Sequence, residues 1–393
     1  MSDFVQGVRI VTEFLLQPGD YPLRMKCEQY SQELIMDKSG PYTSFGSGKT
    51  SMKFLTRNLV CSLMAIGLLI SAIPRVAGAA QGASADAATA GTSSTPAQLV
   101  DALNLVFGKQ TDNRAVHAKG IVLHGRFVPS RAAAGLSRAL HFQTDPVPLT
   151  LRFSNFAGIP TIPDNDGLAN PRGLALKFQL PDGTATDLVT HSFNGFPAPT
   201  ADDFRQFLIA LGTSGTGVAH PTPADTYLAA HPVAKTFLES QKPPPVSYAT
   251  LSYFGVNTFK FTNARGVSRY GRYRIIPQAG EQFLTAEQAK QAPPGYLADE
   301  IRQRAARAPV RFRMLVQLAA DGDRLADPSI AWPETRATID VGTIEITSVA
   351  ADSDAEQREL MFLPTALPAG IEAADPMIAA RSAAYPVSYT RRH

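Results

Sequence analysis

Strand-like runs separated by turn residues fill most of the chain after residue 98, and they constrain the fold more than any other feature. The runs cover residues 118–129, 147–154, 172–180, 186–191, 251–262, 267–277, 310–318 and 337–347. The helical patterns cover residues 200–212, 223–241 and about 285–306. Many antiparallel-looking strands with clustered helices predict an α+β domain built around a closed sheet.

Shorter signals refine this outline at both ends of the domain. Thr95 is placed to cap a short amphipathic helix whose apolar residues include Leu99 and Leu103. The segment PDGTATD, residues 181–187, predicts a hairpin turn. After a loop, a last helix is expected from about Pro376 to Tyr385.

The composition excludes several classes of protein. The chain has 393 residues, 44% of them hydrophobic, which is enough to bury a sizeable core. The net charge of +3 is too small and too scattered to indicate a nucleic-acid partner. The two cysteines, Cys27 and Cys61, lie early in the chain. A protein that begins after Cys61 therefore has no disulfide, cysteine nucleophile or thiolate-bound cofactor.

The first part of the chain predicts export. Residues 52–79 form a signal peptide, with Lys53 and Arg57 before an apolar run and small residues at the end. The run is shorter than the ~20 residues of a membrane span, although an uncleaved anchor is the alternative. Residues 1–51 are then a doubtful extension, either from a wrongly assigned start or as a short cytosolic tail. Residues 80–97 predict a flexible linker, and residues 98–393 the folded domain. We expect a periplasmic or secreted protein with no membrane contact after cleavage.

Seven segments of the domain, taken in their order along the chain, are informative together. They are RAVHAKG (114–120), LRFSNFAG (151–158), NPRGLALKF (170–178), DLVTHSFNGFP (187–197), VNTFKFTNARG (256–266), DPSIAWPE (327–334) and LPAGIEAADPMIAARSAAYP (367–386). In this order they resemble the haem catalases, most closely the short catalase-related peroxidase branch. The resemblance implies a catalase-like fold, in which helices surround an antiparallel eight-stranded β-barrel, and it implies haem b as cofactor.

The resemblance gives Tyr385 the role of metal ligand, as a phenolate on the haem iron. A free tyrosine has a pKa near 10, so iron and a nearby cation must keep it ionised. Arg381 lies four residues earlier on the expected helix, and therefore on the same face. Without the resemblance, a buried tyrosine with an unrelated arginine would explain the pair equally well.

The resemblance makes His117 the catalytic acid–base group. It would take a proton from one peroxide oxygen and return it to the other, so that water leaves. Ser154 matches the serine that fixes the tautomer of this histidine. For a lone histidine considered by itself, a structural role is the alternative.

Arginines and aromatic residues complete the expected cofactor site. Arg114 and Arg152 match the arginines that bind the haem propionates, since a guanidinium fork suits a carboxylate. Arg392, or its neighbour Arg391, would supply a third. Phe204 and Phe196 match aromatic residues on the same side as His117, although core packing would explain both.

One position departs from the family pattern. Large catalases carry an asparagine after DLVG that orients the peroxide, and here His191 stands in that place, with Asn194 three residues later. We take both as candidate catalytic residues. A second ionisable ring would change how protons are handled, which favours a peroxidase cycle over dismutation of hydrogen peroxide.

The leading hypothesis is a haem peroxidase that reduces hydrogen peroxide or organic hydroperoxides with a small organic electron donor, with residual catalase activity. The alternatives are a haem enzyme that rearranges fatty-acid hydroperoxides and a non-catalytic haem-binding protein. We expect a monomer or a small homo-oligomer. The sequence does not name the donor.

Overall fold

The computed structural model describes residues 93–143 and 145–393. The strands are β1 (Gly120–Pro129), β2 (Val147–Ser154), β3 (Gly173–Gln179), β4 (Ala185–His191), β5 (Tyr253–Phe254), β6 (Phe259–Thr262), β7 (Ser268–Pro277), β8 (Val310–Leu318), β9 (Thr338–Val349) and β10 (Ile371–Ala373). Each named pair of strands is antiparallel. Most of these strands fall where the sequence predicts them.

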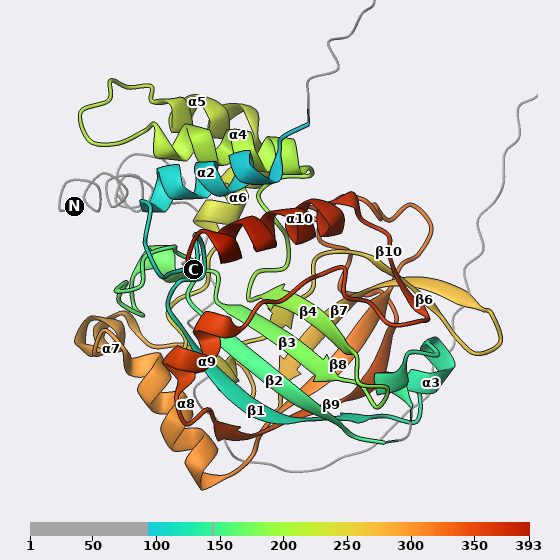
Figure 1. Cartoon of the computed structure of the whole chain (residues 1–393). Helices are drawn as coiled ribbons and strands as arrows, with labels where there is room; N and C mark the ends of the chain where they lie inside the picture. The colour runs from blue at the N-terminus through green and yellow to red at the C-terminus, as the bar shows by residue number, and fades with distance from the viewer. Residues whose placement is uncertain (1–92, 144) are drawn as a thin grey trace, which may run out of the picture. The chain divides into compact units, whose positions relative to one another are not determined.

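Eight of these strands close into a barrel (Figure 1). The order around the ring is β1-β2-β3-β4-β5-β7-β8-β9, with β9 returning to β1. Closure depends on the long β7, which pairs with β5 and β6 along one edge and with β8 along the other. The short β10 adds to β6 outside the ring. This confirms the eight-stranded antiparallel barrel with surrounding helices, and closing the sheet removes the exposed strand edges.

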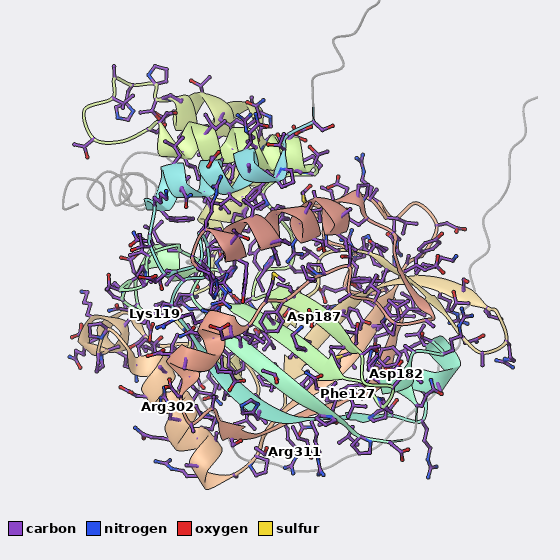
Figure 2. The ribbon with its side chains drawn as sticks, in the orientation of Figure 1. Lys119, Phe127, Asp182, Asp187, Arg302 and Arg311 are labelled. Atoms are coloured by element: carbon purple, nitrogen blue, oxygen red, sulfur yellow. The ribbon has the colours of Figure 1, made fainter. Side chains whose placement is uncertain are left out.

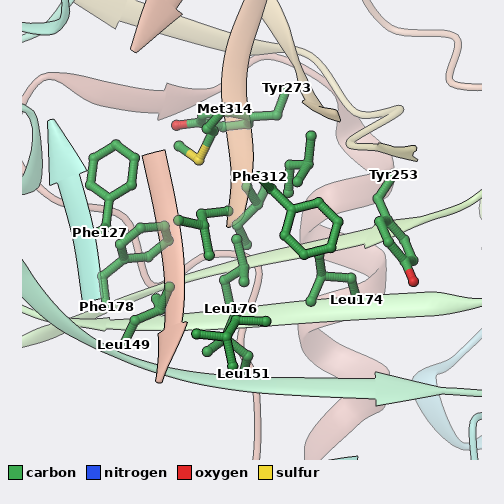
Figure 3. Close-up of a cluster of buried hydrophobic side chains, with 14 of the residues drawn as sticks. Phe127, Leu149, Leu151, Leu174, Leu176, Phe178, Tyr253, Tyr273, Phe312 and Met314 are labelled. Carbon is green, nitrogen blue, oxygen red and sulfur yellow. The ribbon is translucent and has the colours of Figure 1, made fainter. Parts of the chain in front are cut away.

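The barrel interior is filled by apolar side chains (Figure 3). Because side chains alternate along a strand, Leu149 and Leu151 of β2 point inward together with Leu174 and Leu176 of β3. All four are at most 2% exposed. Their neighbours in sequence point to the outer face of the same strands, and that face carries the candidate site.

The helices are α2 (Pro96–Phe107), α3 (Ala133–Leu136), α4 (Ala201–Gly212), α5 (Pro223–Ala230), α6 (Pro232–Glu239), α7 (Ala286–Gln291), α8 (Tyr296–Arg307), α9 (Ser353–Glu359) and α10 (Pro376–Thr390). Short 3₁₀ turns span Leu140–Phe142, Gly167–Ala169 and Tyr248–Thr250. Figure 1 shows α10 lying between the barrel and a layer that contains α2 and α4. A second apolar cluster, which includes Phe107, Phe207 and Leu208, packs this helical layer together.

Several elements end where prolines or turns require it. The predicted helix 223–241 is two helices, since His231 precedes Pro232 and is pushed out of the helical region. The predicted helix 285–306 is also two helices, divided at Pro293 and Pro294.

Other differences lie near the carboxyl end of the chain. The helix α10 continues through Pro386 to Thr390, five residues beyond the predicted end. The helix α9 and the strand β10 were not predicted, since both are too short to show a period.

A side chain on the outer face of the barrel, Asp187, also holds a later part of the chain, and Figure 2 labels it. Asp187 of β4 accepts hydrogen bonds from Lys177 Nζ at 2.7 Å and from the Leu363 N–H at 2.7 Å. Because it is nearly fully buried, this carboxylate fixes the connection between α9 and α10 against the barrel.

The predicted extension, signal peptide and most of the predicted linker lie outside the described residues. Helix α2 begins at Pro96 with Thr95 as its N-cap, so the linker prediction runs two residues too far. In the described part of the chain, no helix has the length and apolar character needed to cross a bilayer.

Candidate haem site

A cavity of about 210 Å³ lies against the outer face of β2, β3 and β4, beneath α2, α4 and α10. Its walls are mostly apolar, and they include Phe196 and Phe204, whose ring centroids are 4.8 Å apart. The polar and ionisable side chains in the lining are Arg114, His117, Arg152, Ser154, Thr190, His191, Asn257, Arg381, Tyr385, Ser388 and Arg392. The structure thus brings together all the sequence-predicted site residues except Asn194.

His117 stands on a strained turn just before β1. Its backbone has a φ of +57°, a region that residues other than glycine rarely occupy. Two hydrogen bonds to the backbone of His117 fix this conformation: its N–H donates to the Phe156 carbonyl at 2.7 Å, and its carbonyl accepts from the side-chain Nη2 of Arg152 at 2.9 Å. These hydrogen bonds hold the strained backbone in place. The backbone conformation in turn directs the imidazole into the cavity.

The imidazole of His117 is fixed by its neighbours on the barrel. Nδ1 lies 3.0 Å from Ser154 Oγ, and the ring meets the ring of Phe156 edge-on at a centroid distance of 5.5 Å. Gly173 makes room for this contact, because a Cβ there would lie 2.6 Å from Ser154 Oγ and 2.9 Å from His117 Nδ1. Since Nδ1 is engaged, Nε2 is the ring nitrogen left for chemistry in the cavity.

His117 stays neutral over a wide range of pH. Burial, followed by the positive charge of Arg152, lowers the pKa of the imidazole to about 3. A neutral ring has an unprotonated nitrogen, so it accepts a proton from a bound substrate.

His191 lies on the same face of the barrel and two strands away from Ser154. Ser154 pairs with Gly173, and Gly173 pairs with His191, so the three residues form one row across β2, β3 and β4. Residues in such a row point to the same side of a sheet. His117 leans over the glycine in the middle of the row, and the row ends in the second histidine.

The ring of His191 has one hydrogen bond and one free nitrogen. Its Nδ1 accepts the Phe193 N–H at 3.4 Å, so a neutral ring carries its proton on Nε2. Nε2 is buried and has no partner among the described residues. Burial, followed by the charge of Arg381, lowers the pKa of His191 to about 3. His191 therefore offers a hydrogen-bond donor to the cavity.

Asn194 does not line the cavity. Its side-chain amide donates to Glu334 Oε1 at 3.3 Å, on the segment before β9. The chain turns sharply between His191 and Gly195, and the turn carries the amide away from the row that holds His191.

Tyr385 and Arg381 lie one turn apart on α10 and face the cavity. Arg381 Nη2 donates to Tyr385 Oη at 2.8 Å and Nε does so at 3.2 Å, as the sequence spacing predicts. Arg381 Nη1 donates in turn to Asn257 Oδ1, and Asn257 Nδ2 donates to Asp375 Oδ2 at 2.7 Å. A positive charge and two N–H groups therefore point at the phenol oxygen.

Three arginines gather at one end of the cavity, and no carboxylate of the described residues lies within ion-pair distance of them. Arg114, Arg152 and Arg392 donate only to backbone carbonyls and to the amide of Gln357. Among the described residues, no carboxylate forms an ion pair with any of them. Arg391 instead pairs with Asp101 at 2.7 Å, so Arg392 is the third arginine of the cluster.

The electrostatics of this arginine cluster favour an anion. Burial, followed by the charges of Arg152 and Arg392, lowers the pKa of Arg114 to about 7. Burial likewise lowers the pKa of Arg152 to about 10. Arg392 Nε is buried and has no partner among the described residues. A ligand with carboxylates at this end would relieve the repulsion and satisfy the free donor.

Comparisons with known proteins place the chain in a family. The catalase family model matches residues 79–393. Two proteins named catalase-related peroxidase are similar over most of their length. The protein from Mycolicibacterium paratuberculosis is 36% identical over 302 residues, which cover 76% of this chain and 95% of that one. The protein from Synechococcus elongatus is 33% identical over 308 residues, which cover 77% of this chain and 90% of that one.

A solved structure supports the fold. The crystal structure of a fungal catalase matches with a TM-score of 0.65 and 21% sequence identity, covering 75% of this chain and 62% of that chain. The chain belongs to the catalase family. It is an oxidoreductase that acts on peroxide, in a family whose cofactor is haem.

The residues of the cavity fit a haem. The unneutralised arginine cluster suits two carboxylates at one edge, the apolar walls suit the flat faces of the ring, and the phenol beside Arg381 suits ferric iron. Sequence reasoning did not single out Asn257 and Asp375 behind Arg381, or Gly173 and Gln357. Asn257 and Asp375 lie inside segments that carry the resemblance, but neither spacing nor residue type relates them to Arg381.

Proposed function

We propose that this protein is a haem b peroxidase that reduces hydrogen peroxide or organic hydroperoxides with electrons from a small organic donor. One observation carries the proposal: His117, Tyr385 and the arginine cluster line a single cavity, although they come from distant parts of the sequence. When bound, haem b would supply the redox chemistry by which electrons from the donor reduce the O–O bond.

The chain's own residues would hold the cofactor in place. Tyr385 would bind the iron through its phenol oxygen, to which Arg381 Nε and Nη2 donate hydrogen bonds. Arg114, Arg152 and Arg392 bind the two propionates. The apolar walls around Phe196 and Phe204 would exclude water from the cofactor.

His117 transfers the proton in this reaction. Its free Nε2 takes a proton from one oxygen of the peroxide and returns it to the other oxygen, which leaves as water or as an alcohol. Ser154 keeps the imidazole in one tautomer through the 3.0 Å contact with Nδ1. The donor supplies two electrons in all, and two protons complete the reduction of ROOH to ROH and water.

His191 takes part as a hydrogen-bond donor. Its Nε2 carries the proton of a neutral ring and is free, so it holds a peroxide oxygen while Nε2 of His117 accepts a proton. One imidazole accepts and the other donates, and this pairing suits the O–O bond of a bound hydroperoxide.

The test is the optical spectrum of the purified protein followed by turnover. We expect a Soret band of ferric haem with a phenolate ligand, and oxidation of a donor dye when peroxide is added. Oxygen release from peroxide alone, at a rate above dye oxidation, would indicate a catalase instead. Loss of a fatty-acid hydroperoxide without donor oxidation would indicate rearrangement, and a spectrum without any turnover would indicate haem binding alone.

We also propose that the protein is exported. The basis is the basic start, apolar run and small residues of residues 52–79. N-terminal sequencing of protein recovered from the periplasm or medium is expected to begin after residue 79. A product that retains the apolar run would contradict the proposal.

A further inference from the structure

Helix α9 is held firmly against the barrel wall. It lies beside β1 in Figure 1 and contacts that strand. Ser353 Oγ accepts the Val122 N–H at 2.9 Å, and Glu356 Oε2 lies 3.0 Å from His124 Nε2. These contacts anchor both turns of the helix to β1, so its carboxyl end has a fixed position.

That carboxyl end faces the arginine cluster. The Gln357 carbonyl accepts from Arg114 Nη2 at 2.8 Å, and the Leu360 carbonyl accepts from Arg392 Nη2 at 3.1 Å. The last carbonyls of a helix lack partners within the helix, so they are free to accept these bonds. The backbone of α9 thus holds two of the three arginines.

The side chain of Gln357 holds the third. Its Oε1 accepts from Arg152 Nη2 at 3.0 Å and from Nε at 3.2 Å. Its Nε2 donates to Asp354 Oδ1 at 2.8 Å, and this bond fixes which end of the amide faces the arginine. Through one backbone oxygen and one side-chain oxygen, Gln357 therefore joins Arg114 to Arg152.

The lack of charge on the Gln357 side chain matters more than its shape. An amide oxygen accepts the hydrogen bonds of Arg152 but leaves its positive charge unneutralised. A glutamate of the same length would form a bidentate ion pair with the same guanidinium. The guanidinium would then be a weaker partner for any other anion.

We propose that Gln357 is a positioning residue for the cofactor, which orients Arg152 and Arg114 while leaving their charge available to the haem carboxylates. The inference rests on the proposed function, since the carboxylates belong to the cofactor proposed there. Gln357 is outside the cavity lining and acts through the arginines.

The experiment compares two variants of the haem-loaded protein with a control. Gln357→Glu keeps the size and adds the charge, whereas Gln357→Met keeps the size and removes the acceptor. Gln303→Glu, on the exposed face of α8, makes the same chemical change away from the cluster. The rate of haem loss is measured by transfer to excess apomyoglobin, for normal haem and for haem whose carboxylates are methyl esters. The thermal midpoint of each haem-free variant is measured alongside.

We expect Gln357→Glu to lose normal haem about tenfold faster than the control. The new carboxylate would form charge-assisted bonds with Arg152 and so compete with the haem carboxylates for it. Gln357→Met should show a smaller increase. With the ester, the variants and the control should lose haem at the same rate. The haem-free midpoint of Gln357→Glu should not fall below that of the control.

Two results would overturn the inference. One is equal loss of normal haem from Gln357→Glu and the control. The other is a difference that persists with the ester or that follows a fall in the haem-free midpoint. Failure of the unmodified protein to bind any haem would instead contradict the proposed function.

Discussion

Along β2 and β3, the side chains that point into the barrel differ in kind from those that point outward. The inward side chains are leucines and phenylalanines that pack against each other. The outward side chains include Arg152 and Ser154, and they are covered by helices. Arg152 and Ser154 are buried like the inward side chains, but only the inward face is satisfied by apolar packing.

The difference teaches how one set of strands carries both stability and chemistry. Truncation of a core side chain lowers the free energy of unfolding, because the neighbouring side chains cannot fill the gap. A position on the outer face holds polar groups in fixed directions, and its replacement disturbs those directions. Substitution of Leu151 should therefore lower stability, whereas substitution of the adjacent Arg152 should disturb the site.

The largest expected effect is on the outer face, at His117. His117→Ala removes the proposed proton acceptor and should lower kcat/KM for peroxide by about 10³-fold. The haem spectrum should persist, because the arginine cluster and Tyr385 remain. Stopped-flow kinetics with hydrogen peroxide check this, and turnover within a few-fold of the unmodified protein would refute the role of His117.

On the inner face, Leu151→Ala should act on stability. The side chain is fully buried, so truncation should lower the free energy of unfolding by about 2–5 kcal/mol. Below the unfolding transition, kcat/KM should stay near that of the unmodified protein. Urea unfolding and initial rates measure the two quantities. A fall in activity without a fall in stability would break the proposed division between the faces.

Gly173→Ala should act on the outer face with a smaller effect than the loss of His117. The new Cβ would push on Ser154 Oγ and the His117 ring, both within 3.0 Å of its position. A misplaced acid–base group of this kind costs activity by about 10- to 100-fold. Steady-state kinetics are compared with Gly135→Ala, which makes the same change where a Cβ would meet nothing within 4 Å. Equal activity of both variants would show that the glycine is not needed.

The smallest expected effect is on stability in acid. It comes from His141, which packs among aromatic side chains of the core. His141 contacts the rings of Phe127, Phe142 and Phe178, and burial lowers its pKa to about 3. Between the unfolded pKa near 6.5 and this value, only the unfolded state binds the proton, so stability falls as the pH decreases.

His141→Phe should therefore resist acid better than the unmodified protein and differ little from it above pH 6.5. Thermal unfolding at several pH values checks this. An acid transition at the same pH in both proteins would show that His141 does not contribute.

Local sequence accounts for much of the fold and for part of the site. Strand-like runs between turn residues predicted β2 and β8 to the residue. The spacing of Arg381 and Tyr385 predicted their hydrogen bond, since helical residues four apart share a face. The resemblance supplied the other site residues, and the structure brings nearly all of them to one cavity.

By itself, the sequence determined what depends on neighbours along the chain: strand faces, helix faces and the residues available for chemistry. Only the tertiary structure decided which residues meet across long separations. It placed His191 rather than Asn194 at the cavity, and Arg392 rather than Arg391 in the cluster. It also brought Gln357 and Asn257 to arginines from other elements. The physical reason is that closure of the barrel and packing of α9 and α10 on its outer wall fix these meetings, and no local pattern encodes them.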